Sequence, residues 1–199
     1  VAANELAGHN IALILGDNIF YGDGLSKRIQ EAATQDKGAT IFGYEVADPS
    51  AFGVVELDKN GRAISLEEKP KKPKSKLAVP GVYFYDPDVL DIAWKLKPSG
   101  RGELEITDVN RAYMERGDLH VKTIGRGVAW LDGGTHADLF EAGQFIKVVE
   151  ERTGLKVACP EEIAFRMGFI DRAGLAELVD DSPKTEYQKY LKDLLARSV

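Results

Sequence analysis

The sequence lacks several features that would assign a protein to a class at once. It holds one cysteine, Cys159, among 199 residues, which excludes an internal disulfide and fits a reducing cytoplasm. The formal net charge is −6, which argues against a sequence-independent nucleic-acid binder, because such a protein needs a basic face. No apolar run approaches the length of a membrane span and no signal peptide is visible, so we expect a cytoplasmic protein without a membrane partner.

The residues that are present fit a globular protein with a sizeable core. Hydrophobic residues make up 44% of the chain and charged residues 29%. Strand-like and helix-like segments alternate up to about residue 152, whereas only helical patterns follow Cys159. We therefore expect an α/β domain over residues 1–152 and a helical extension over residues 153–199 that makes subunit contacts.

Apolar periodicity and turn residues predict the individual elements. The expected strands are 11–15, 39–46, 53–57, 63–66, 82–85, 119–124 and 128–131, and the expected helices are 25–35, 88–96, 105–115, a helix ending near 152, 161–167, 173–179 and 185–196. Asn60-Gly61 between two strands is a strong hairpin signal. The run Ile11–Leu15 is typical of a buried parallel strand. The expected fold is a Rossmann-like, mixed but mostly parallel sheet flanked by helices, with an inserted β-hairpin.

Two of the predicted strands end in a carboxylate, Asp17 and Asp132. Ligands of open α/β sheets bind beyond the carboxyl ends of strands, and Mg²⁺ is typically held by one or two carboxylates plus substrate phosphates. The pair is thus a candidate metal site. The alternative is that each aspartate caps a turn or helix, since Asp-Asn and Asp-Gly-Gly both favour turns.

Two further stretches could bind a sugar phosphate. In Glu67-Glu68-Lys69-Pro70, the lysine could meet a phosphate and the adjacent acid could accept sugar hydroxyls. In the stretch 101–105, Arg101 could grip a phosphate. The alternative for the first stretch is a surface Glu/Lys pair that contributes little to stability. The alternative for the second is that its acids, Glu103 and Glu105, simply favour a helix N-terminus.

Taken together, these motifs resemble those of the sugar-1-phosphate nucleotidyltransferases, and among them the branch that transfers thymidylyl groups. The matching stretches cover nearly the whole chain in the family's order: LGDNIFYG at 15–22, FGVVELDKNGRAISLEEKPKKPKS at 52–75, PGVYFYD at 80–86, SGRGELEITDVN at 99–110, WLDGGTH at 130–136 and GLKVACPEEIAFRMGFI at 154–170. No single stretch is specific, but the set is.

The resemblance implies an enzyme, its substrates and its cofactor. The sugar-phosphate oxygen of glucose 1-phosphate would attack the α-phosphorus of dTTP directly, which gives dTDP-glucose and pyrophosphate, with Mg²⁺ neutralising the developing charge. The family also implies a homotetramer and a role in making dTDP-rhamnose.

The resemblance also implies roles for residues at matching positions. Asp17 and Asp132 would be the Mg²⁺ ligands and, with Lys69, the catalytic residues. The sugar phosphate would be bound by Gly53, Glu68, Lys69, Val79, Tyr83, Arg101 and Trp130. A second nucleotide site for feedback by the pathway's end product would use Tyr21, Gly22, Glu162, Ile163 and Arg166, although Glu162 and Arg166 could equally be a simple i,i+4 helix pair.

One departure from the family pattern matters for function. The family begins with a Gly-rich loop, G-G-x-G-T-R-L, that cradles the triphosphate, and this sequence contains no such loop. We therefore expect the C-terminal part of such an enzyme, with an exposed apolar sheet edge. Two alternatives stay open: a non-catalytic sugar-phosphate-binding module, and a nucleotidyltransferase that uses UTP, ATP or GTP.

Overall fold

The computed structural model describes residues 3–181 and 183–197. The chain divides into two compact units, residues 1–134 and residues 135–199. Our expected domain boundary lay later, after residue 152, near the end of the long helix α5 (His136–Thr153) with which the second unit opens.

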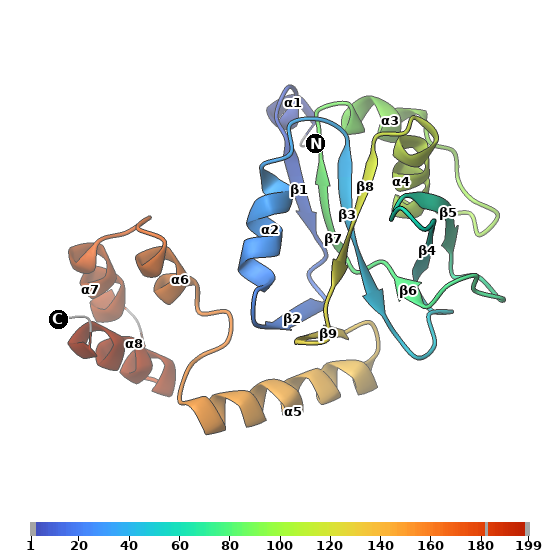
Figure 1. Cartoon of the computed structure of the whole chain (residues 1–199). Helices are drawn as coiled ribbons and strands as arrows, with labels where there is room; N and C mark the ends of the chain where they lie inside the picture. Colours follow the sequence, from blue (N-terminus) through green and yellow to red (C-terminus); the bar gives the residue numbers. More distant parts are fainter. Residues whose placement is uncertain (1–2, 182, 198–199) are drawn as a thin grey trace. The chain divides into compact units, whose positions relative to one another are not determined.

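The first unit contains the expected α/β elements, drawn in Figure 1. Its helices are α1 (Ala3–Leu6), α2 (Leu25–Ala33), α3 (Val89–Lys95) and α4 (Ile106–Glu115), and its strands are β1 (Ile11–Ile14), β2 (Asn18–Gly22), β3 (Ala39–Glu45), β4 (Gly53–Leu57), β5 (Ala63–Glu68), β6 (Leu77–Ala78), β7 (Val82–Tyr85), β8 (Leu119–Ile124) and β9 (Val128–Asp132). Each strand and helix predicted from the sequence in this unit is present to within a few residues. The short elements α1, β2 and β6 were not predicted.

The strands form a large sheet and a small one, and the large sheet is mostly antiparallel. Its order is β1-β7-β3-β6-β4-β5, with β8 also paired to β3. Among the described strands only β3 and β8 pair in parallel, so our expectation of a mostly parallel sheet is not confirmed. The expected hairpin β4–β5 is confirmed, and its turn is closed by Asp58, whose Oδ1 accepts from the backbone N–H groups of Asn60 and Arg62.

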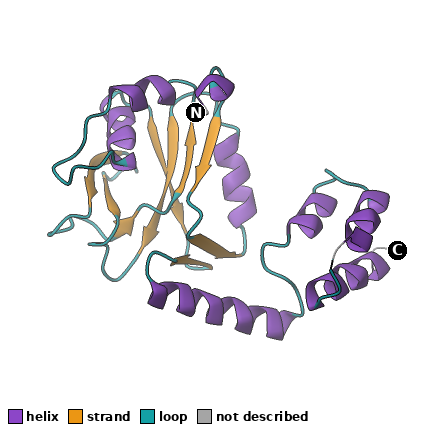
Figure 2. Ribbon diagram, turned by 180° about the vertical axis from the view of Figure 1, so that it is seen from behind, coloured by secondary structure: helices purple, strands orange, loops and turns teal. Residues whose placement is uncertain are grey.

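The central strand β3 is buried over its first five residues because helices cover both faces of the sheet (Figure 2). Successive side chains of a strand point to opposite faces. On β3, Ile41 therefore packs in a cluster with Val109 and Tyr113 of α4, whereas its neighbour Phe42 packs in a second cluster with Ala32 of α2.

Strand β1 lies at the edge of the large sheet and is exposed. It pairs only with β7 in the described sheet, and Leu13, Ile14 and Leu15 are 38%, 58% and 40% exposed. The prediction of a buried strand at 11–15 is therefore wrong in burial, although the strand exists. The exposed apolar edge that we expected from the family pattern is present.

The second unit is entirely helical in its described residues, as predicted. After α5 it contains α6 (Pro160–Arg166), α7 (Arg172–Asp181) and α8 (Glu186–Arg197). Its core is a cluster of five buried residues, Cys159, Leu175, Val179, Leu191 and Leu194. No described helix combines the length and the hydropathy that a membrane span requires.

A buried hydrogen bond ties α4 to the sheet and offers a first test of the fold. The hydroxyl of the fully buried Tyr113 donates to Oδ1 of the buried Asp86 at 2.6 Å, and burial together with this bond raises the pKa of Tyr113. We expect Tyr113→Phe to lower the free energy of unfolding by about 1.5–3 kcal/mol, because the hydroxyl serves a charged acceptor. The matched variant Tyr44→Phe removes a bond to the neutral carbonyl of Val128 and should lose only about 0.5–1.5 kcal/mol.

Urea denaturation followed by tryptophan fluorescence measures this difference, because both tryptophans, Trp94 and Trp130, lie in the first unit. If the two variants lose equal free energy of unfolding, the bond from Tyr113 to Asp86 is no stronger than a bond to a neutral acceptor, which would contradict this account.

Candidate active site

The two strand-end aspartates meet through the small sheet. Strands β2 and β9 pair antiparallel with Asn18 opposite Asp132, and Asp17 directly precedes Asn18. The backbone N–H of Gly133 donates to the carbonyl of Asp17 at 2.7 Å, which closes this end of the ladder. Two carboxylates far apart in the sequence are thus brought to one place.

The side chain of Asn18 lies between these carboxylates. Its Nδ2 donates to Oδ1 of Asp17 at 2.8 Å and to Oδ1 of Asp132 at 3.3 Å. Its Oδ1 accepts from the backbone N–H of Gly81 at 3.0 Å and from Nε1 of Trp130 at 2.8 Å. We did not predict a role for Asn18. Its signal in the sequence, the Asn after a strand-end Asp, was interpreted as a turn.

A cleft of about 210 Å³ opens beside the aspartates. Eight of the residues predicted for catalysis or substrate binding line it: Asp17, Gly53, Glu68, Lys69, Val79, Tyr83, Trp130 and Asp132. They come from the small sheet, the β4–β5 hairpin and the segment from Val79 to β7. Positions predicted from separate motifs are therefore adjacent in space.

One wall of the cleft is formed by Glu68 at the end of β5. The hydroxyl of the buried Thr107, in α4, donates to Oε2 of Glu68 at 2.5 Å. Gly53 pairs with Glu68 across the hairpin, and a Cβ at Gly53 would lie 3.0 Å from Oγ1 of Thr107 and 3.4 Å from Oε2 of Glu68. A glycine therefore leaves room over this carboxylate. Thr107 was not singled out from the sequence, since one Thr in a helix carries no signal.

One of the two backbone polar groups of Val79 is already hydrogen-bonded within the protein. Its N–H donates to the carbonyl of Gly53 at 2.8 Å, so this donor already serves the protein itself. Aromatic rings form another wall, with the rings of Phe52 and Trp130 4.8 Å apart. Burial, aided by the negative charges of Glu68 and Asp17, raises the pKa of Tyr83 well above its ordinary value, so its hydroxyl is protonated at neutral pH.

Lys69 enters the cleft from a strained backbone. Its φ is +43°, in the left-handed region, which residues other than Gly, Asn and Asp seldom adopt. Its N–H donates to the carbonyl of Phe52 at 3.0 Å, which holds the residue at the end of the hairpin. No ion pair of Lys69 occurs among the described residues. Such strain clusters at functional sites.

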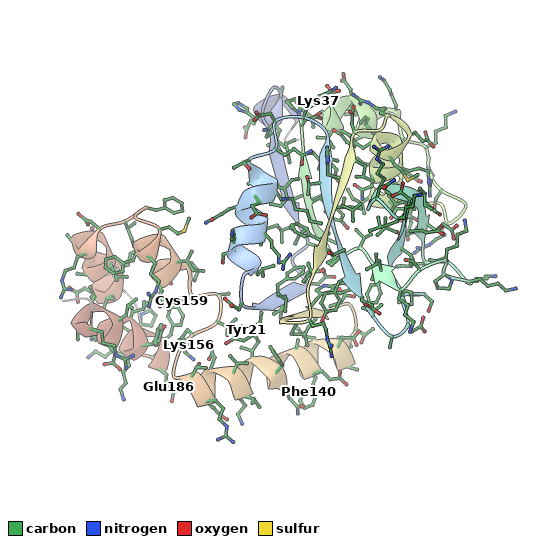
Figure 3. The ribbon with its side chains drawn as sticks, in the orientation of Figure 1. Tyr21, Lys37, Phe140, Lys156, Cys159 and Glu186 are labelled. Atoms are coloured by element: carbon green, nitrogen blue, oxygen red, sulfur yellow. The ribbon has the colours of Figure 1, made fainter. Side chains whose placement is uncertain are left out.

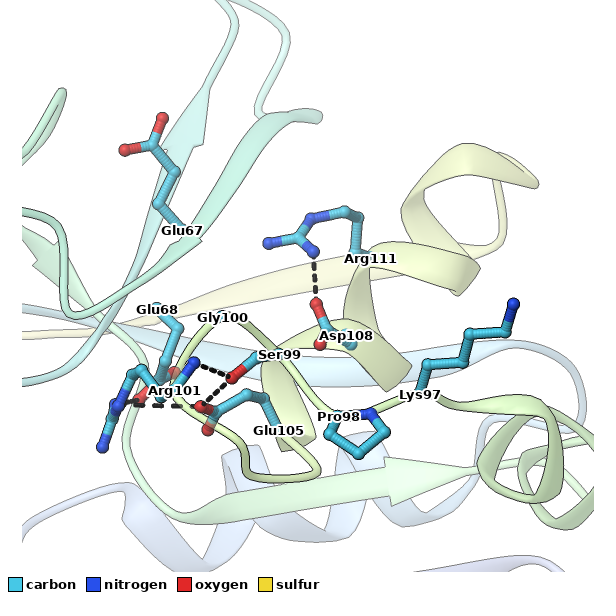
Figure 4. Close-up of a pocket in the computed structure, with 10 residues that line it drawn as sticks. All are labelled: Glu67, Glu68, Lys97, Pro98, Ser99, Gly100, Arg101, Glu105, Asp108 and Arg111. Atoms are coloured by element: carbon cyan, nitrogen blue, oxygen red, sulfur yellow. Dashed lines mark hydrogen bonds and ion pairs between the residues drawn. The ribbon is translucent and has the colours of Figure 1, made fainter.

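Arg101 lies in a neighbouring cavity of about 520 Å³, shown in Figure 4, and not in the cleft. The two cavities share Glu68. The guanidinium of Arg101 is 3.7 Å from Glu68, 3.2 Å from Glu103 and 3.8 Å from Glu105. Arg101 was predicted to bind the sugar phosphate, but in the structure its guanidinium pairs with carboxylates of the protein.

The residues predicted for a regulatory site lie in both units. Tyr21, labelled in Figure 3, and Gly22 are on β2, and a Cβ at Gly22 would lie 2.3 Å from the carbonyl of Gly127, which is a packing reason for glycine. On α6, Ile163 is half exposed, and Glu162 is buried and accepts from Arg166 at 2.7 Å. The simple i,i+4 pair is therefore formed, and the regulatory role stays a prediction.

The donor set suits a divalent cation that also binds phosphates. The described residues contain no group of three or more His, Cys, Asp or Glu side chains placed to hold a metal. Asp17 and Asp132 supply two carboxylates. These lie close together, because both accept a hydrogen bond from the same amide nitrogen, that of Asn18. Mg²⁺ commonly takes one or two protein carboxylates, with phosphate oxygens and water completing its octahedron.

The chain is similar to known proteins over almost its whole length. The chain matches the glucose-1-phosphate thymidylyltransferase of Xanthomonas campestris pv. campestris (strain B100) with 52% identity over 99% of the chain and 67% of the relative's length. It matches the Mycolicibacterium smegmatis protein of the same name with 53% identity over 99% of the chain and 68% of that protein. The chain thus spans about two thirds of the length of these relatives.

Two solved structures share the fold. A putative glucose-1-phosphate thymidylyltransferase from Bacillus anthracis, in complex with a sucrose, superposes with a TM-score of 0.64 at 41% identity, over 72% of this chain and 57% of that one. A UDP-glucose pyrophosphorylase complexed with UDP-glucose, 24% identical and with the same TM-score, supports the fold alone. The family model described as nucleotidyl transferase matches residues 1–148. The chain therefore belongs to the nucleotidyl transferase family.

Proposed function

We propose that this protein takes part in thymidylyl transfer from dTTP to glucose 1-phosphate, which yields dTDP-glucose and pyrophosphate. The observation that carries the proposal is the cleft in which two paired carboxylates lie beside Glu68 and Lys69. The names of the relatives, which are about half identical over almost the whole chain, supply the substrate class. The reaction is direct attack of the sugar-phosphate oxygen on the α-phosphorus.

In this proposal Asp17 and Asp132 hold Mg²⁺ at the open end of the small sheet. The ion, when bound, neutralises charge that develops on the phosphates. The two carboxylates position it. Gly133 holds the backbone of Asp17, and the amide of Asn18 bonds both carboxylates. Catalysis by these groups is positioning and electrostatics, as is usual for transfer at phosphorus.

The glucosyl group fits the wall made by the hairpin and α4. The carboxylate of Glu68 accepts sugar hydroxyls while Thr107 holds it in one orientation. Gly53 leaves the room that a ring needs, and the protonated Tyr83 hydroxyl can donate. The carbonyl of Val79 faces the same group in this proposal, because its N–H is used within the protein.

The phosphate is met by Lys69. An ammonium group held at a fixed strand end suits a phosphate as a point charge. We propose Arg101 as a second phosphate contact, for which its guanidinium exchanges Glu68, Glu103 and Glu105 for the substrate. We also propose that the protein works in the cytoplasm as an assembly of several copies. The one cysteine, Cys159, is buried and free, which fits that compartment.

Pyrophosphate release tests the reaction. With dTTP, glucose 1-phosphate and Mg²⁺, we expect release to depend on all three and to fall at least about 100-fold in Asp17→Asn and Asp132→Asn, because each removes a charge that places the ion. Asp36→Asn, which removes a charge at an exposed position outside the cleft, is the control. Faster release with UTP, ATP or GTP would contradict the choice of base. Binding of glucose 1-phosphate without any release would favour a non-catalytic binding module.

Binding can be measured separately by fluorescence. Trp94→Phe leaves Trp130, in the cleft wall, as the one emitting tryptophan, whereas Trp130→Phe leaves Trp94, which is 76% exposed on α3. We expect glucose 1-phosphate to change the emission of the first variant in a saturable way and to leave that of the second unchanged. Equal responses, or none from Trp130, would place the sugar phosphate outside the cleft.

The strain at Lys69 predicts opposite effects on stability and on binding. Lys69→Gly should raise the free energy of unfolding by about 0.5–1 kcal/mol, because relief of the left-handed conformation, about 1–2 kcal/mol, exceeds the added backbone entropy loss. Affinity for glucose 1-phosphate should fall about tenfold while affinity for glucose stays constant. The matched variant Lys69→Ala keeps the strain, so it should lose affinity equally without gaining stability. A stability gain in both variants would refute the strain.

A further inference from the structure

The amide of Asn18 has one possible orientation. Its oxygen faces two N–H donors, those of Gly81 and Trp130, and its nitrogen faces the carboxylates of Asp17 and Asp132. A 180° flip would set the NH₂ group against two donors and the oxygen against two anions. Both sides of the amide are therefore specified by their neighbours.

This arrangement makes Asn18 more than a surface polar residue. One amide nitrogen bonded to two carboxylates holds them at a fixed separation while adding no charge of its own. Without such a donor, two like charges this close repel each other. The oxygen of the same amide anchors this spacer to the cleft wall through Trp130 and to the start of β7 through Gly81.

We propose that Asn18 is a positioning residue that sets the spacing and the charge of the divalent-cation site, an inference that rests on the proposed function. Two carboxylates balance one dication, so the occupied site is close to neutral and can accept phosphates. A third carboxylate here would bind the cation more tightly and repel the phosphate of the substrate. The neutrality of the amide is therefore as important as its hydrogen bonds.

The substitution Asn18→Asp separates these roles. Aspartate keeps oxygens that can accept from Gly81 and Trp130, but it removes both donors and adds a negative charge beside Asp17 and Asp132. The control is Asn60→Asp, which makes the same chemical change in the exposed turn between β4 and β5.

Three measurements on the chain test the inference: thermal unfolding without divalent cations, Mn²⁺ affinity by electron paramagnetic resonance, and glucose 1-phosphate binding by the fluorescence of Trp130. In Asn18→Asp we expect a lower Tm without cations, and an Mn²⁺ affinity raised about 30-fold, the effect of one more unit negative charge about 4 Å from a dication in water. Mn²⁺ should raise the Tm of this variant more than that of the unaltered protein, and glucose 1-phosphate should bind more weakly. Asn60→Asp should change neither the Mn²⁺ affinity nor the binding of glucose 1-phosphate, and the Tm that it loses to repulsion from Asp58 should not be restored by Mn²⁺.

The double variant Asp17→Asn/Asn18→Asp restores the original charge and should recover much of the lost Tm. A lower Tm that the double variant does not recover, with unchanged Mn²⁺ affinity, would reduce Asn18 to a structural residue and overturn the proposal. An unchanged Tm and unchanged Mn²⁺ affinity would overturn it too.

Failure of the proposed function gives a different pattern. If the unaltered protein and Asp17→Asn bind Mn²⁺ equally weakly, the metal site itself is wrong. The comparison of Tm values without cations still decides whether Asn18 spaces the two carboxylates.

Discussion

The pairing of β2 with β9 is the constraint on which the site depends. It sets Asn18 opposite Asp132 and thereby brings Asp17 to the same place. The amide of Asn18 then reaches across to the N–H of Gly81, at the start of β7, so the small sheet is tied to the large one. The acids that would hold a cation are thereby fixed relative to the wall that would hold a sugar.

The rest of the cleft follows from the β4–β5 hairpin. The hairpin ends in Glu68, which Thr107 of α4 orients, and then in Lys69, whose backbone is left-handed. The core that holds α4 against the sheet, with Tyr113 and Asp86 at its centre, therefore also supports the position of Glu68. Rigid packing behind the cleft and strain at its rim are consistent with a site that is positioned before its ligand arrives.

Much of this could be predicted from the sequence. Periodicity located the longer elements, and the resemblance to a family placed eight residues that line one cleft. The parallel sheet was not confirmed, because it was predicted from the apolar run Ile11–Leu15, and hydrophobicity does not fix strand direction: β1 pairs antiparallel with β7. Strand β1 looks buried by composition but lies at an edge. The position of Asn18 after a strand-end Asp indicated only a turn, and Thr107 gave no signal, since a hydrogen bond between residues distant in the chain leaves no pattern in either segment.

The most direct test of the account is to locate the cation and the sugar together. Crystals grown with Mn²⁺ and dTDP-glucose would give an anomalous difference peak for the metal. The account predicts one peak within coordination distance of the carboxylates of Asp17 and Asp132, with the glucosyl group against Glu68 and Gly53. A metal peak elsewhere, or a glucosyl group outside this cleft, would contradict it.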